Sequence, residues 1–114
     1  MQELIDIKEE QERVILVAVQ LESDDDTEES VDELKELADT AGALTVGRLI
    51  QKRERPQAST YIGKGKIEEL RELIAETKAT GIITDDELSP AQMRNLEAEL
   101  ETKVMDNQSG MRRS

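Results

Sequence analysis

The residues best suited to chemistry lie at positions 51–66, a basic stretch punctuated by glycine and proline in an otherwise acidic chain. From position 48 to position 66 the charge is +5, whereas the whole chain carries −12. The basic residues here are Arg48, Lys52, Arg53, Arg55, Lys64 and Lys66. Arginine forks suit bidentate contact with phosphate, and Pro56 keeps the chain out of regular helix. The pattern predicts an exposed basic loop that binds nucleic acid. The alternative is a solvated loop paired with the acidic body.

A glycine-rich sequence, Gly63-Lys64-Gly65-Lys66, closes this stretch and leads into a predicted helix. We expect a tight turn, where helix amides and two lysines could face an anion. It is not a Walker A motif, because its glycines are too close together and no Ser or Thr follows Lys66. The structural alternative is a strand-to-helix turn that needs positive φ, with solvated lysines. Tyr61, the single aromatic residue, could stack on a base or pack at the rim of the core.

Three consecutive carboxylates, Asp85, Asp86 and Glu87, raise the question of a metal or acid–base site. They follow a predicted strand, and ligands of α/β proteins often lie at the carboxyl ends of strands. They also precede a predicted helix, whose positive end attracts carboxylates without any ligand. The chain has no His and no Cys, which removes histidine bases, thiolate metal sites, cysteine nucleophiles and disulfides. We favour the structural interpretation and predict no catalytic residue and no metal ligand.

The composition limits the kinds of protein that this chain can be. Its 114 residues suffice for one small domain with a single core. The acidic start has no apolar signal-peptide core, and no apolar run approaches the ~20 residues that a membrane helix needs. We therefore expect a soluble, cytoplasmic protein without a membrane span. A net charge of −12 alone would oppose nucleic-acid binding, and only the basic stretch reopens that possibility.

Apolar periodicity predicts an α/β fold in which strands and helices alternate. Residues 13–20 form a continuous apolar run rich in Val and Ile, typical of a strand buried on both faces. Further strands are predicted at 43–51, 80–84 and 103–106, and helices at 30–41, after Gly65 and from Pro90. This order forces parallel pairing through right-handed crossovers. We expect a three-layer sandwich with a mostly parallel four- to five-stranded sheet flanked by about three helices.

Local signals set the expected boundaries of these elements. Ser30 with Glu33, and Ser89 with Gln92, form capping-box patterns at the starts of two helices. Residues 59–62 could pair back onto 48–52 as a hairpin, which would make residues 53–58 a projecting basic tip. The domain is expected to span residues 1–106. Residues 107–114 have no periodicity and are expected to be a disordered tail.

Several long motifs in a fixed order carry a resemblance to a known family. They are LKELA at 34–38, TAGA at 40–43, GR at 47–48, QKRERP at 51–56, TYIGKGK at 60–66, EEL at 68–70, DDELSPAQ at 85–92 and RNLE at 94–97. Together they resemble the N-terminal domain of HflX-type ribosome-associated GTPases, over residues 13–106. The resemblance implies an α/β domain that precedes a helical linker and a GTPase domain. Lys78 stands where many relatives have a helix-ending Gly.

The resemblance also implies partners and site residues. HflX-type proteins bind the large ribosomal subunit, some split ribosomes, and their N-terminal domain contacts ribosomal RNA near the peptidyl-transferase region. By position, residues 52–56 and 63–66 would face the RNA. The complete set of expected nucleic-acid-binding residues is Arg48, Lys52, Arg53, Arg55, Tyr61, Gly63, Lys64, Gly65 and Lys66.

The resemblance leaves two alternatives for this domain, which are ATP binding and regulation of the GTPase domain of the same protein. The chain contains no Walker A, DxxG or NKxD motif, so it is not expected to hydrolyse GTP. We expect GTP and Mg²⁺ only in the GTPase domain, and ATP is the one cofactor that the resemblance leaves open for this chain.

Overall fold

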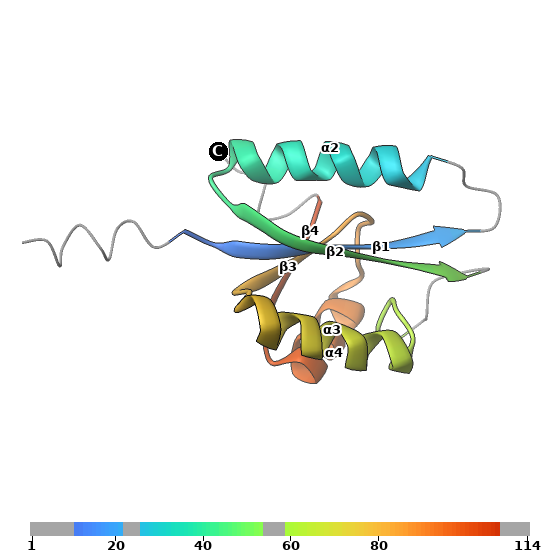
Figure 1. The fold of residues 1–114 in the computed structure, drawn as a ribbon. Helices are drawn as coiled ribbons and strands as arrows, with labels where there is room; N and C mark the ends of the chain where they lie inside the picture. Colours follow the sequence, from blue (N-terminus) through green and yellow to red (C-terminus); the bar gives the residue numbers. More distant parts are fainter. Residues whose placement is uncertain (1–10, 22–25, 54–58, 108–114) are drawn as a thin grey trace, which may run out of the picture.

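The structure, a computed structural model, describes residues 11–21, 26–53 and 59–107 as a three-layer α/β sandwich (Figure 1). The strands are β1 (Arg13–Leu21), β2 (Leu44–Arg53), β3 (Gly81–Thr84) and β4 (Lys103–Asp106). The helices are α2 (Thr27–Thr40), α3 (Lys64–Thr77) and α4 (Pro90–Leu100). All strand pairs are parallel, and the strand order is β2-β1-β3-β4. The predicted fold class and order of elements are confirmed.

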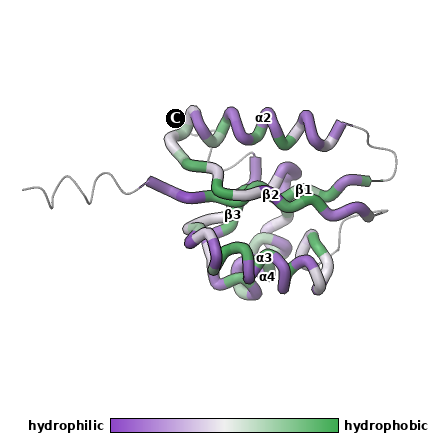
Figure 2. Tube along the Cα trace, in the orientation of Figure 1, coloured by the Kyte–Doolittle hydropathy of each residue, from purple (hydrophilic) through white to green (hydrophobic). Residues whose placement is uncertain are grey.

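The sheet is covered by one helix on one face and by two on the other. Figure 1 shows α2 on one side of the strands and α3 and α4 on the opposite side. Alternate residues of β1 belong to the two layers, because successive side chains of a strand point to opposite faces. Val14, Leu16 and Ala18 pack with α2, and Ile15, Val17 and Val19 pack with α3 and α4. Figure 2 shows the hydrophobic residues concentrated along these central strands.

Of the two predicted capping boxes, the structure contains one, at the start of α4. The capping box of α4 is confirmed, since Ser89 and Gln92 exchange both side-chain hydrogen bonds and Pro90 takes the first helical position. The capping box expected at Ser30 is wrong, because α2 begins one turn earlier, at Thr27. Thr27 is buried, and the acidic residues in its first turn favour a helix N-terminus there.

The hairpin expected from residues 48–52 and 59–62 does not form. Among the described residues, 59–62 is a turn with an isolated bridge at Tyr61, and β2 pairs only with β1. Successive side chains of a strand point to opposite faces of the sheet, whereas the side chains of Tyr61 and Ile62 both enter the core layer on the side of α3 and α4, so this segment does not run beside β2 as a strand. Of the predicted basic tip, Arg53 is the last residue of β2, and residues 54–58 lie outside the described part.

The carboxyl end of the fold extends one residue beyond the expected domain boundary. Asn107, assigned from the sequence to a tail, donates a hydrogen bond from its side-chain amide to the Asp85 carbonyl. It therefore belongs to the folded body, and residues 108–114 lie outside the described part. None of the described helices has the length and apolarity that crossing a membrane would require.

Candidate nucleic-acid interface

The predicted binding residues gather at one edge of the sheet. All four strands are parallel, so their carboxyl ends lie at the same edge, which we call the carboxyl edge. Lys52 and Arg53 end β2 there, and α3 begins there at Lys64. The hydrogen bond from Gly63 N to Gln51 Oε1, 2.9 Å long, joins the start of α3 to the end of β2. The fold thus brings both halves of the basic stretch together.

The cations nevertheless do not form one continuous positive face. Arg48 aligns with Leu16 of β1 and points toward α2, where its guanidinium contacts Asp32 at 3.0 Å and Glu28 at 3.4 Å. Lys66 lies on the other side of the sheet and contacts Glu69 at 3.0 Å. Two of the predicted cations are therefore paired with acidic side chains of the body. The predicted binding cations therefore do not share one surface, because strand alternation and the helix surfaces distribute them over two layers.

Lys52 and Lys64 remain available at the carboxyl edge. Both side chains are exposed, and neither forms an ion pair with any other residue that the structure describes. They flank residues 53–63 from opposite ends. The side chain of Arg53 and the whole of Arg55 lie outside the described part, so their expected role remains a prediction. Arg94 of α4, which sequence reasoning did not single out, is also exposed; the next residue, Asn95, donates a 3.0 Å hydrogen bond to the Ser59 carbonyl.

Tyr61 is a core residue, and its predicted stacking on a base is wrong for this conformation. Its side chain is 1% exposed. The hydroxyl accepts a hydrogen bond from Val19 N at 3.2 Å and donates one to Asp86 Oδ2 at 2.7 Å. Burial raises the pKa of the phenol, and the nearby Asp86 carboxylate raises it further. The sequence pointed to this outcome only through the alternative of a Tyr packed at the core rim.

The two glycines of the GKGK sequence do not adopt the positive φ expected of them. Gly63 is the N-cap of α3 with φ −75° and ψ 168°, and Gly65 lies within the first turn of the helix. The left-handed residue is Tyr61, with φ 77°. An ideal Cβ on Gly65 would meet no heavy atom within 4 Å, so the surface over this helix start is open. Whether the exposed start of α3 contacts an anion remains a prediction.

The acidic residues after β3 have structural partners. The Asp85 amide donates to the Val17 carbonyl at 2.9 Å, and the Asp86 carboxylate accepts from Tyr61. Burial raises the pKa of Asp85, a hydrogen bond from Ser30 lowers it, and neighbouring carboxylates raise it. In the described ranges, no group of three or more acidic side chains is placed to hold a metal ion.

The strand order identifies where a ligand would be expected in a fold of this kind. From β1 the chain adds β2 on one side and then β3 and β4 on the other, so the strand order reverses between β1 and β3. Open α/β sheets bind ligands in the crevice at such a reversal. Here the buried Tyr61 side chain reaches this place, with its hydroxyl between Val19 of β1 and Asp86 after β3. The residues around it are acidic rather than phosphate-binding. This arrangement disfavours an ATP site at the reversal point.

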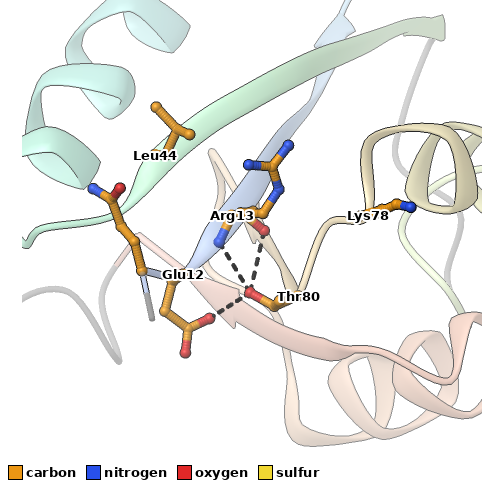
Figure 3. Close-up of a pocket in the computed structure, with 6 residues that line it drawn as sticks. Glu12, Arg13, Leu44, Lys78 and Thr80 are labelled. Carbon is orange, nitrogen blue, oxygen red and sulfur yellow. Dashed lines mark hydrogen bonds between the residues drawn. The ribbon is translucent and has the colours of Figure 1, made fainter. Parts of the chain in front are cut away.

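A hollow of about 460 Å³ lies at the opposite, amino edge of the sheet (Figure 3). Its polar groups are engaged with one another: Thr80 Oγ1 donates to Glu12 at 2.8 Å and accepts from Arg13 N at 3.0 Å. The Arg13 guanidinium donates two hydrogen bonds to the Thr77 carbonyl at the end of α3, at 3.1 and 2.9 Å. Lys78 stands at the rim. Among the lining residues that the structure describes, Glu12, Arg13 and Thr80 are thus engaged with protein groups, and Lys78 is the exposed cation.

Comparisons with known proteins place the chain in a family. A profile described as "GTP-binding GTPase N-terminal" matches residues 28–109, and GTPase HflX of Lacrimispora saccharolytica is 60% identical over 106 residues. The chain belongs to the HflX family. GTPase HflX of Escherichia coli is 34% identical over 95 residues. These matches cover 93% and 83% of the chain but 25% and 22% of the relatives, so the chain spans about a quarter of their length.

Solved structures support the fold of this HflX domain. A GTP-binding protein from the archaeon Sulfolobus solfataricus, crystallised with GDP, is 20% identical with a TM-score of 0.60. The similarity covers 82% of the HflX domain and 27% of that chain. The same motifs that carry the family resemblance supply the contacts at the carboxyl edge. TYIGKGK provides Tyr61 and Gly63, DDELSPAQ provides Asp86, and RNLE provides Asn95.

Proposed function

We propose that this chain is the ribosome-binding module of an HflX-type GTPase and contacts ribosomal RNA of the large subunit with its carboxyl edge. Lys52 and Lys64 contact phosphates there, together with Arg53 and Arg55 of the intervening segment. In the full-length protein this contact assists ribosome splitting or rescue, while a separate GTPase domain binds GTP and Mg²⁺. The chain itself binds and does not catalyse.

The observation that carries this proposal is the placement of unpaired cations. Arg48, Lys66 and Arg71 are compensated by carboxylates, as are Lys35 and Lys103. Lys52 and Lys64, exposed and without a described ion-pair partner, both adjoin the segment richest in arginine. Phosphate contact requires cations that are free to replace the counterions of the RNA. In a chain of net charge −12, these two lysines and the arginine-rich segment between them support the carboxyl edge as the proposed contact with RNA.

The test is co-sedimentation of the chain with purified large ribosomal subunits at increasing salt. Binding should weaken between about 50 and 200 mM salt, because phosphate contacts release counterions. Replacing Lys52, Arg53 and Arg55 together with Glu should abolish binding and leave the circular dichroism spectrum unchanged.

A pair of single substitutions supplies the matched control. Lys52→Gln and Lys78→Gln remove the same charge from exposed side chains at opposite edges of the sheet. Only Lys52→Gln should weaken binding. It should also reduce the slope of log affinity against log salt concentration by the equivalent of roughly one phosphate contact. Equal effects of the two substitutions, or unchanged binding by the triple Glu variant, would reject the carboxyl edge as the RNA-binding surface.

The ATP alternative receives a separate test. Addition of ATP at millimolar concentration should leave the amide NMR signals of Gly63, Gly65 and Ile67 unchanged if the helix start is not a nucleotide site. Shifts confined to these amides would favour ATP binding instead. Regulation of the GTPase domain is tested by comparing GTP turnover of the full-length protein with and without this domain.

A further inference from the structure

We propose that Tyr61 is a positioning residue for RNA binding: its hydroxyl fixes the turn before α3 and so sets the place of Lys64 relative to Lys52. This inference rests on the proposed function, because it concerns how the same two lysines are presented to phosphate.

The first observation is that one hydroxyl connects three parts of the fold. Tyr61 lies in the turn before α3, Val19 lies in β1, and Asp86 follows β3. The hydroxyl accepts from Val19 N at 3.2 Å and donates to Asp86 Oδ2 at 2.7 Å. A phenol donates one hydrogen bond and accepts others, so both kinds of bonding are used here. The turn is therefore tied to the carboxyl ends of two neighbouring strands.

The second observation is the backbone conformation of Tyr61. Its φ of 77° lies in the left-handed region, which is unusual for a bulky side chain. Such a conformation persists only where surrounding contacts determine it, and it is enriched at functional sites. The contacts here are the ring, which is 1% exposed, and the two hydrogen bonds of the hydroxyl. A glycine would relieve the backbone strain, but it would lose the ring and both bonds.

The third observation links this turn to the two lysines. Gly63 N donates to Gln51 Oε1 at 2.9 Å. Gln51 immediately precedes Lys52, and Gly63 immediately precedes Lys64. The two lysines thus adjoin the two partners of one hydrogen bond, and Asn95 of α4 holds the other end of the turn at the Ser59 carbonyl. A fixed separation of the lysines lowers the cost of ordering them on two phosphates of a folded RNA.

The experiment compares Tyr61→Phe with the parent chain in the large-subunit binding assay. Phenylalanine keeps the ring in the core and removes only the hydroxyl. We expect affinity at fixed low salt to fall by about three- to tenfold, the scale expected when a surface loses preorganisation. The salt dependence should stay unchanged because no cation is removed, whereas Lys64→Gln should reduce it by roughly one contact. Relaxation of the Gly63 and Lys64 amides should show increased motion in Tyr61→Phe.

Controls separate positioning from a general loss of stability. Val31→Ala removes buried side-chain atoms beneath α2, on the face opposite Tyr61, and should lower the thermal midpoint without changing affinity. Gln51→Leu breaks the hydrogen bond to Gly63 with the tyrosine intact and should weaken binding as Tyr61→Phe does. It also keeps the inference testable if Tyr61→Phe does not fold.

The possible results distinguish the two proposals. Parent-like affinity of both Tyr61→Phe and Gln51→Leu, with weaker binding by Lys64→Gln, would overturn the positioning role and leave the proposed function standing. Unchanged binding by both Lys52→Gln and Lys64→Gln would overturn the proposed function, and the positioning role with it.

Discussion

Replacing Thr45 with Val should stabilise the protein. Thr45 lies in β2 opposite Val14, beside a bulge where the register shifts so that Ile15 pairs with Gly47. Its Oγ1 is buried and has no hydrogen-bond partner in the described part of the chain. A buried polar group without a partner costs about 1–3 kcal/mol. Valine has nearly the same shape and suits a strand, so the substitution should recover about 1 kcal/mol of the unfolding free energy.

The expected signal is large enough to measure. For a chain of this size, about 1 kcal/mol corresponds to a rise of roughly 3–6 °C in the thermal midpoint. Thermal unfolding followed by circular dichroism gives the midpoint, and urea unfolding with an unchanged slope confirms an effect on stability alone. Thr84→Val is the matched control, because Thr84 Oγ1 is in a strand but donates to the Asp86 carbonyl at 2.9 Å. That substitution should lower stability by about 1 kcal/mol. A midpoint for Thr45→Val at or below the parent's would refute the reasoning, since it would mean that the hydroxyl is satisfied in solution.

Two further predictions concern stability. Lys78 ends α3 in the left-handed conformation with φ 58°. The strain costs a non-glycine residue about 1–2 kcal/mol, and glycine loses about 0.5–1 kcal/mol in chain entropy, so Lys78→Gly should raise the unfolding free energy by about 0.5–1 kcal/mol. Urea unfolding measures it, and a decrease would contradict the strain. Asp85→Asn should stabilise the protein at neutral pH, because burial raises the folded-state pKa of Asp85 and so disfavours its charged form. This advantage should be present above the folded-state pKa and shrink as the pH falls through it. Unfolding curves of both chains across that range check the sign, and an advantage that grows in acid would exclude it.

Much of the fold followed from local patterns. The continuous Val and Ile run of β1 indicated a strand buried on both faces, and Ser89 with Pro90 and Gln92 fixed the start of α4. These signals lie within a few residues of one another, so period and capping chemistry suffice to interpret them. The start of α2 predicted from the capping pattern at Ser30 is wrong, because the acidic Glu28 and Glu29 favour a helix N-terminus one turn earlier.

The candidate site was less predictable, because its contacts are distant in sequence. Asp86 reaches Tyr61 across 25 residues, and Asn95 reaches Ser59 across 36. No local pattern contains that information, so the sequence left Tyr61 open between base stacking and packing at the rim of the core, whereas the structure buries it. The ion pairing of Arg48 could have been predicted more easily from the sequence. Strand alternation alone puts Arg48 and Lys52 on the face opposite Leu49, and the next layer on that side is the acidic helix α2.

The acidic residues of this domain limit how the proposed RNA contact could form. Carboxylates on α2 and α3 pair with the cations nearest to them, as in Arg48 with Asp32 and Lys66 with Glu69. The remaining negative charge on these helices repels phosphate, and like-charge repulsion excludes wrong orientations at an interface. Under the proposed function, RNA would approach the carboxyl edge, where Lys52 and Lys64 are exposed beside the exposed Asp86 and Glu87. Under that proposal, the net charge of −12 would weaken overall attraction to RNA, and the acidic helices would restrict the orientation in which the domain binds.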